Sequence, residues 1–224
     1  MQTVISGFAR AAHLAVLSLV LGAASVGSAW GQEAADPAAV AEMLRDGGYV
    51  LVMRHTRAPQ PSANQAQGQR GFGGNRGGRG GGRGGPAGAP GERQLDEIGQ
   101  AHATALGFAF RQLGIEMGEV LRSPTLRAEQ TATYLGYDAS AVDELAPGAE
   151  SADWLRGKAA EPPAAGTNRL LITHRPNIEA AFGEAAADMM DGETLVLRPE
   201  DDGARVVGRL SVRDWAVLAV GEGS

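Results

Sequence analysis

Two uninterrupted apolar runs, each ending in a histidine, place the strongest constraint on how this chain can fold. Residues 49–53 read Tyr-Val-Leu-Val-Met and lead directly into Arg54 and His55. Residues 170–173 read Leu-Leu-Ile-Thr and lead into His174. An apolar run without alternation is typical of a strand that is covered on both faces, as in a parallel sheet between helices. We therefore expect such a sheet, with a histidine at the end of two of its strands.

Helical patterns lie between these runs and on either side of them. A first helix is expected to start at Pro37, behind an Asp36 N-cap, and to stop before the Gly47-Gly48 pair. The other expected helices cover residues 96–113, 126–135 and 177–190, and the other expected strands cover residues 119–122, 194–197, 206–212 and 216–220. Buried strands that alternate with helices predict an α/β fold, a three-layer α/β/α sandwich with a mostly parallel central sheet.

Residues 1–31 have the composition of a secretory signal peptide. Arg10 supplies the positive charge, residues 11–26 are almost all apolar or small, and the Ala-Trp-Gly ending suits a signal peptidase. The alternative is an uncleaved membrane anchor, because an apolar run of this length approaches a membrane span. Small residues lower the hydrophobicity of its second half, so we expect cleavage before Gln32. The protein is then periplasmic or secreted, without stable membrane insertion, and residues 32–224 form its one domain.

Residues 60–91 interrupt that domain with a stretch that cannot contribute to a core. Glycine and Arg-Gly-Gly repeats dominate it, and Phe72 is its single large apolar residue. Such a stretch cannot bury enough surface to offset the entropy lost on ordering. We expect a disordered insertion in a surface loop.

Arginines in this stretch and at its border raise the alternative of an RNA-binding arm. They are Arg70, Arg76, Arg79, Arg83 and Arg93. In an intracellular protein a disordered basic arm of this kind would suggest RNA binding. The expected export signal and the net charge of −6 argue against a nucleic-acid partner. A solvated flexible loop is the expected state, and contact with anionic envelope surfaces or capture of substrate near His55 is the alternative.

Cationic and imidazole side chains follow three of the expected strands. Arg54 and His55 end one strand, His174 ends another, and Arg122 and Arg127 flank the junction between a third strand and its helix. Ligands bind beyond the carboxyl ends of the strands in such sheets. Two histidines without cysteines or a matching carboxylate motif make a poor metal site, so no metal or other cofactor is expected. Arginine forks and a helix N-terminus instead suit a phosphate.

The same cluster suggests how a histidine could act as a nucleophile. Nearby positive charge disfavours imidazolium, so His55 is expected to be neutral with a lone pair free for attack on phosphorus. The arginines would stabilise charge on the equatorial oxygens during phosphoryl transfer. Arg122 is expected to form a structural ion pair rather than to contact phosphate.

These motifs together resemble the histidine phosphatase superfamily, which also contains the cofactor-dependent phosphoglycerate mutases. Arg54-His55-Thr56 corresponds to the family's Arg-His-Gly after the first strand, and residues 123–132 match its Ser-Pro-x-x-Arg-Ala-x-Gln-Thr-Ala run throughout. Thr173-His174, followed by a helix, matches its third signature, and residues 95–101 look like its helix start between the first two motifs. The similarity extends over about residues 38–220, apart from the glycine-rich insertion.

The resemblance implies a phosphoglycerate mutase-like fold and a two-step reaction without metal. His55 attacks phosphorus while Arg54, Arg127 and His174 hold the phosphoryl oxygens, and water then hydrolyses the phosphohistidine. The substrate would be a phosphorylated small molecule or a phosphoprotein, as a phosphoric monoester or a phosphoramidate. Mutase activity is not expected, because the short stretch 132–168 offers no counterpart to the substrate-closing segments of mutases.

Two departures from the family pattern bear on catalysis. Thr56 stands where the family has glycine, and we expect this to be tolerated. Residues 143–147 resemble the short members related to the bacterial phosphohistidine phosphatase, which lack the general acid of other relatives. Glu144 is the one candidate for that acid. The alternative function is therefore a non-catalytic phosphate- or phosphosugar-binding protein of the cell envelope that keeps the pocket without an acid.

Overall fold

The computed structural model describes residues 36–60 and 92–221. The expected signal peptide and, apart from Gln60, the expected insertion lie outside these residues. No helix in the described part of the chain is long and apolar enough to cross a membrane.

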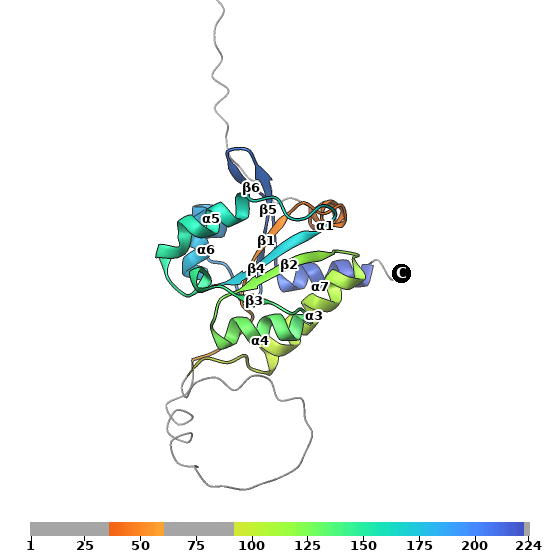
Figure 1. Ribbon diagram of the computed structural model, residues 1–224. Helices are drawn as coiled ribbons and strands as arrows, with labels where there is room; N and C mark the ends of the chain where they lie inside the picture. Colours follow the sequence, from red (N-terminus) through yellow and green to blue (C-terminus); the bar gives the residue numbers. More distant parts are fainter. Residues whose placement is uncertain (1–35, 61–91, 222–224) are drawn as a thin grey trace, which may run out of the picture. The chain divides into compact units, whose positions relative to one another are not determined.

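A single six-stranded sheet organises the described residues (Figure 1). Its strands are β1 (Val50–Arg54), β2 (Met117–Arg122), β3 (Ser140–Ala141), β4 (Asn168–Thr173), β5 (Thr194–Glu200) and β6 (Gly203–Leu210). They lie in the order β3-β2-β4-β1-β5-β6. The first four are parallel, whereas β5 pairs antiparallel with both β1 and β6. The predicted α/β class with a mixed, mostly parallel sheet is confirmed.

Helices cover both faces of this sheet (Figure 1). On one face lie α1 (Pro37–Arg45), α3 (Glu97–Gln112), α4 (Leu126–Leu135) and α7 (Val212–Gly221); on the other lie α5 (Ala152–Ala160) and α6 (Arg175–Phe182). Within β1, Leu51 and Met53 pack into the core of the first face, and Val50 and Val52 into that of the second. All four are fully buried, each worth roughly 1.5–3 kcal/mol. Burial on both sides explains why the run does not alternate.

Strand register brings the predicted functional residues to one edge of the sheet. Arg54 lies opposite Thr173 across the β1–β4 pair, and Arg122 lies opposite Ile172 across the β2–β4 pair. The carboxyl ends of three parallel strands are therefore neighbours. Side chains that follow them must meet at the same edge.

The start of α3 is built to approach the segment that follows His55. Asp96 caps the helix, its Oδ1 accepting a hydrogen bond from the Gly99 amide at 2.8 Å. A Cβ atom at Gly99 would lie only 2.1 Å from the carbonyl oxygen of Arg57. Glycine at this position therefore permits the close contact between helix and loop.

The predicted strand at 216–220 is wrong, because these residues belong to α7. Its apolar residues suit a strand or a helix equally well. Ser211 and Asp214 decide the outcome: each donates its backbone amide to the other's side chain, which caps the helix. Trp215 and Ala219, four residues apart, then face the core.

Other element boundaries also differ from the prediction. The helix expected over 177–190 begins two residues earlier, as α6, and ends at Phe182, because Gly183 adopts a positive φ of 56°. A short 3-10 turn, Gly183–Ala186, follows it. The strand expected over 206–212 is shifted towards the N-terminus, as β6. Helix α5 and the two-residue strand β3 were not predicted.

Candidate active site

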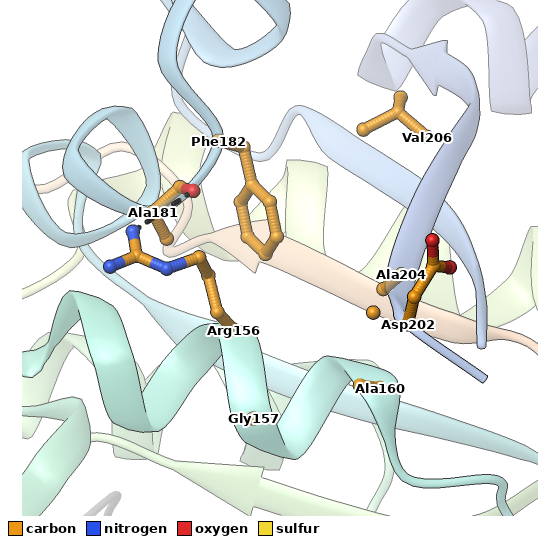
Figure 2. A pocket seen from close by; sticks show the side chains of 9 residues that line it. Arg156, Gly157, Ala160, Ala181, Phe182, Asp202, Ala204 and Val206 are labelled. Carbon is orange, nitrogen blue, oxygen red and sulfur yellow. Dashed lines mark hydrogen bonds between the residues drawn. The ribbon is translucent and has the colours of Figure 1, made fainter. Parts of the chain in front are cut away.

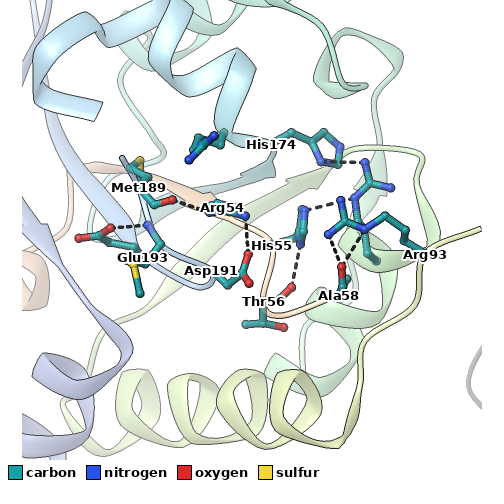
Figure 3. Close-up of polar contacts among 12 residues, drawn as sticks. Arg54, His55, Thr56, Ala58, Arg93, His174, Met189, Asp191 and Glu193 are labelled. Carbon is teal, nitrogen blue, oxygen red and sulfur yellow. Dashed lines mark hydrogen bonds and ion pairs between the residues drawn. The ribbon is translucent and has the colours of Figure 1, made fainter. Parts of the chain in front are cut away.

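The four predicted site residues lie together at the carboxyl edge of the parallel strands. Figure 3 shows Arg54, His55 and His174 at this edge. Arg54 is the last residue of β1 and His55 follows it; His174 follows β4 and is the N-cap of α6. Arg127 lies in the first turn of α4. Both imidazoles are only 3% exposed, and their ring centroids are 5.2 Å apart. Residues separated by more than a hundred positions in the sequence thus form one cluster.

The ring of His55 is held in a defined tautomer. Its Nδ1 lies 2.7 Å from the carbonyl oxygen of Thr56. A carbonyl oxygen can only accept, so Nδ1 carries the proton. Nε2 therefore has the lone pair, and it accepts a hydrogen bond from Nε of Arg127 at 3.2 Å. The nitrogen that a nucleophilic histidine would use faces the cationic group of the cluster.

Arg127 bridges the two histidines. Besides its bond to His55, its Nη2 lies 3.2 Å from Nδ1 of His174. Arginine only donates, so Nδ1 of His174 is unprotonated and Nε2 carries the proton. That Nε2 lies 2.8 Å from the hydroxyl of Ser123, which in turn donates to Thr125. The two rings therefore hold opposite tautomers.

Arg54 is oriented by the loop that precedes β5. Its Nη1 donates to the carbonyl oxygen of Met189 at 2.5 Å, and its Nη2 lies 2.7 Å from a carboxylate oxygen of Asp191. Its Nε is buried without a hydrogen-bond partner among the described residues. Buried N–H groups are usually satisfied, so this donor is available to a bound acceptor.

Both imidazoles are uncharged at neutral pH. Burial lowers the pKa of His55 to about 3, against the raising effect of the hydrogen bond to Thr56 and with help from the charges of Arg127 and Arg54. Burial also lowers the pKa of His174 to about 2, with Arg127 as the next cause. The neutral state of His55 was predicted from nearby positive charge alone; desolvation is the larger cause.

The side chain of Thr56, which stands where the resembling family has glycine, is accommodated beside the cluster. Its side chain is fully buried and packs towards α4, with its hydroxyl 3.3 Å from that of Thr131. The Thr131 hydroxyl also accepts from the Thr56 amide and donates to the carbonyl oxygen of Arg127. Thr56 thereby links the carbonyl that orients His55 to the helix that carries Arg127.

Two further candidates make no hydrogen bond or ion pair with Arg54, His55, Arg127 or His174 within the described residues. Glu144 is exposed on the 3-10 turn Asp143–Leu145, and its carboxylate makes no hydrogen bond or ion pair within residues 36–60 and 92–221. Arg122 forms an ion pair with Glu129 at 3.0 Å, the structural role expected for it.

Three residues of the site were not predicted from the sequence: Arg93, Asp191 and Ser123. Arg93, which the sequence groups with the insertion, donates from Nε to the carbonyl oxygen of Ala58 at 2.7 Å, and its charge lowers the pKa of both histidines. Asp191 and Ser123 pair with Arg54 and His174 as described above. Ser123 begins a recognised motif and could have been named. Arg93 and Asp191 carry no local signal, since each lies in a loop.

The described residues contain no group of three or more histidine, cysteine, aspartate and glutamate side chains that could hold a metal ion.

A separate cavity of about 550 Å³ lies between α5, the end of α6 and the β5–β6 hairpin (Figure 2). Phe182 and Val206 give it apolar walls, and Arg156, at its edge, donates to the carbonyl oxygens of Ala180 and Ala181. That cavity has no histidine and lies away from the histidine cluster, since its lining comes from the other end of α6.

No protein-family profile matches the sequence, and no curated protein matches it either. The fold, however, is similar to that of the protein histidine phosphatase SixA in complex with tungstate, with a TM-score of 0.52 and 19% identity over 74% of this chain and 98% of that one. A structure assigned as a SixA phosphohistidine phosphatase from Agrobacterium tumefaciens has a TM-score of 0.48 and 19% identity, over 73% of this chain and 97% of that one. A phosphoserine phosphatase mutant from Entamoeba histolytica has a TM-score of 0.44 and 9% identity, over 74% and 98%.

The similarity to SixA extends over most of both chains and shows a common fold. The expected phosphoglycerate mutase-like architecture is therefore confirmed. At this identity the likeness concerns the fold alone, and the activity has to be argued from the cluster itself.

Proposed function

We propose that this protein is a metal-independent phosphohydrolase that forms a phosphohistidine at His55. The observation that carries the proposal is the state of the His55 ring. Its Nδ1–H is bound to a backbone carbonyl, its pKa is lowered to about 3, and its Nε2 lone pair faces Arg127. A neutral, oriented imidazole beside unneutralised guanidinium groups is suited to attack a phosphoryl group.

In the first step Nε2 of His55 attacks phosphorus in line, and the bond from phosphorus to the leaving group breaks. The leaving group departs with the electron pair and takes a proton from solvent. His55 becomes a phosphorylated imidazolium that keeps its Nδ1–H on the Thr56 carbonyl. The unpartnered Nε of Arg54 and the guanidinium of Arg127 bind the equatorial oxygens, where negative charge develops.

Arg127 has to change acceptors during this step. In the structure its Nε occupies the Nε2 lone pair of His55 and its Nη2 that of Nδ1 of His174. Phosphoryl oxygens are charged and accept hydrogen bonds more strongly than an imidazole nitrogen. Substrate binding therefore draws Arg127 onto phosphate and releases the nucleophile.

In the second step a water molecule attacks the phosphorus of the phosphohistidine. The phosphorus–nitrogen bond breaks, its electron pair returns to Nε2, and the water proton passes to phosphate or solvent. The ring is again neutral, with its proton on Nδ1.

The substrate class follows from the weakness of acid assistance at this site. Glu144 is exposed and outside the cluster, and Asp191 is paired with Arg54. A leaving group that needs little protonation help is therefore favoured, such as the imidazole of a phosphoramidate or the phenol of an aryl ester. The tungstate complex and name of SixA, a protein histidine phosphatase of the same fold, support a tetrahedral oxyanion and a phosphohistidine substrate.

The same lack of an acid favours the second candidate, a non-catalytic phosphate-binding protein. One experiment separates the two functions. The purified protein is assayed with phosphoramidate and with p-nitrophenyl phosphate in the presence of a chelator, and its binding of inorganic phosphate is measured in parallel. We expect turnover of both substrates. Saturable phosphate binding without turnover of either would establish the binding protein instead.

We also propose that the protein is exported to the periplasm or secreted, on the basis of the composition of residues 1–31. A fusion of residues 1–40 to a reporter that is active only after export is expected to give signal. A fusion that stays inactive would overturn export and would favour the alternative hypothesis that the Gly/Arg-rich stretch binds RNA.

A further inference from the structure

Arg93 stands in the segment that leads into α3, and its side chain points towards His55 and Ala58 (Figure 3). Its Nε and Nη2 both donate to the carbonyl oxygen of Ala58, the former at 2.7 Å. The Ala58 residue is 1% exposed, so this acceptor is fixed within the fold. The guanidinium is therefore oriented by a neutral group and keeps its full charge.

The charges around the histidines do not balance without a ligand. Both imidazoles are neutral near pH 7, and Arg54 is paired with Asp191. Within the described residues, no carboxylate forms a hydrogen bond or ion pair with Arg127 or Arg93. Two positive charges thus remain uncompensated, which equals the negative charge of a phosphoryl dianion.

The carboxylate of Glu92 raises the pKa of Arg127 but does not neutralise either guanidinium by direct contact. Glu92 precedes Arg93, but its Oε1 accepts from the backbone amide of Leu126 at 2.6 Å, at the start of α4. Burial and the charge of Arg93 lower the pKa of Arg127, whereas Glu92 raises it. Arg93 and Arg127 therefore repel each other, and a bound anion would relieve the repulsion.

We propose that Arg93 is a substrate-binding residue whose guanidinium binds a non-bridging oxygen of the phosphoryl group together with Arg127, an assignment that rests on the proposed function. Arg54 then binds the phosphoryl group from the β1 side, and Arg93 and Arg127 bind it from the α3–α4 side. Preorganisation by Ala58 lowers the entropy lost when the contact forms.

The test is the affinity for inorganic phosphate, measured by isothermal titration calorimetry on the full chain. Three proteins are compared: wild type, Arg93→Gln and Arg57→Gln. Arg57 is the matched control, because it lies beside Ala58, the residue to which Arg93 donates, and its Nε forms an ion pair with Asp96 at 2.9 Å. Its substitution removes the same charge and, like that of Arg93, removes a contact between residues 57–58 and the segment around the start of α3. Thermal unfolding verifies that both variants are folded.

We expect Arg93→Gln to weaken phosphate binding by roughly 10- to 100-fold, as for the loss of a charged hydrogen bond, and Arg57→Gln to change it by less than about threefold. Equal affinities of the two variants, or no phosphate binding by wild type, would overturn the assignment. Turnover of p-nitrophenyl phosphate is measured on the same samples. Failure of the proposed function appears there as no hydrolysis by wild type, independently of the affinities.

Discussion

The two histidines of the site have nearly the same surroundings and yet differ in what fixes their protons. Each follows a buried parallel strand, each is 3% exposed, and each accepts a hydrogen bond from Arg127. His55 donates its Nδ1–H to a backbone carbonyl, which can only accept. His174 has its Nε2 on the hydroxyl of Ser123, which can either accept or donate.

This difference separates a fixed ring from an adaptable one. The tautomer of His55 cannot change while the Thr56 carbonyl stays in place, so Nε2 is always the nucleophilic nitrogen. The tautomer of His174 can change, because the Ser123 hydroxyl can rotate to donate to Nε2. When Arg127 leaves Nδ1 of His174 to bind phosphoryl oxygens, His174 can carry its proton on Nδ1 and donate a hydrogen bond from there to phosphate.

The largest expected effect is that of His55→Asn. Asparagine keeps a polar side chain but has no nucleophilic lone pair in the Nε2 position. We expect kcat for p-nitrophenyl phosphate to fall by roughly 10⁴-fold or more, since the covalent step is lost. Steady-state kinetics provide the measurement, and phosphate affinity within a few-fold of wild type provides the control for folding. If the variant kept a few per cent of wild-type activity, His55 would not be the nucleophile, and the distinction between His55 and His174 would be wrong.

Substitutions of His174 are expected to have the next largest effects and to depend on which nitrogen is replaced. His174→Asn places an amide N–H near the Nδ1 position, whereas His174→Gln places it near Nε2. We expect kcat/KM to fall about tenfold for asparagine and about 10²- to 10³-fold for glutamine and alanine, as when a transition-state donor is lost. The opposite ranking would show that Nε2 is the donor and that the proposed change of tautomer does not occur.

Ser123→Ala should have a smaller effect, because it acts through His174. The substitution removes the closer hydroxyl partner of His174 Nε2, at 2.8 Å, and leaves the Thr125 hydroxyl at 3.5 Å. At that distance Thr125 replaces the lost hydrogen bond poorly, whichever nitrogen of His174 carries the proton. We expect about a tenfold loss in kcat, from the usual cost of an unsatisfied buried group, with phosphate affinity nearly unchanged. Restoration of activity by cysteine, a weak donor, would support the hydroxyl's role; a silent alanine variant would contradict it.

The smallest effect on turnover is that of pH. Because the pKa of His55 is lowered from 6.5 to about 3, its ionisation should not reduce kcat between about pH 5 and 8. Stability should nevertheless depend on pH. The unfolded chain binds more protons than the folded one between these two pKa values, so this stability is complete above about pH 6.5 and is lost as the pH falls towards 3.

Urea unfolding from pH 7 to pH 4 measures this dependence. We expect the free energy of unfolding to rise more steeply with pH for wild type than for His55→Asn, by up to about 1.4 kcal/mol per pH unit. Parallel slopes for the two proteins would mean that the ring of His55 is not kept neutral by burial.

The parts of the fold that the sequence predicted well are those in which local pattern and burial agree. The runs ending at His55 and His174 are apolar on both faces and flanked by clear helices, so their place in a parallel sheet follows from their composition. The segment at 216–220 is apolar too, but the capping pair Ser211 and Asp214, five and two residues before the run, decides that it is a helix.

The site residues also divide into those that a local sequence pattern predicts and those that it does not. Arg127 and His174 lie at strand–helix junctions, where position along the chain already indicates the edge of the sheet. Arg93 and Asp191 come from loops, and only tertiary contacts with Ala58 and Arg54 bring them to the cluster. The tautomers of the two rings depend on single hydrogen-bond partners, which no sequence pattern specifies.

Trapping the phosphorylated protein tests the central claim most directly. The protein is mixed with phosphoramidate, quenched in alkali, where phosphohistidine survives, and digested; mass spectrometry then locates the phosphoryl group, and phosphorus–nitrogen NMR identifies the nitrogen. We predict a single adduct on Nε2 of His55. Full turnover with the phosphoryl group on Nδ1, on His174 or on no residue at all would contradict the account.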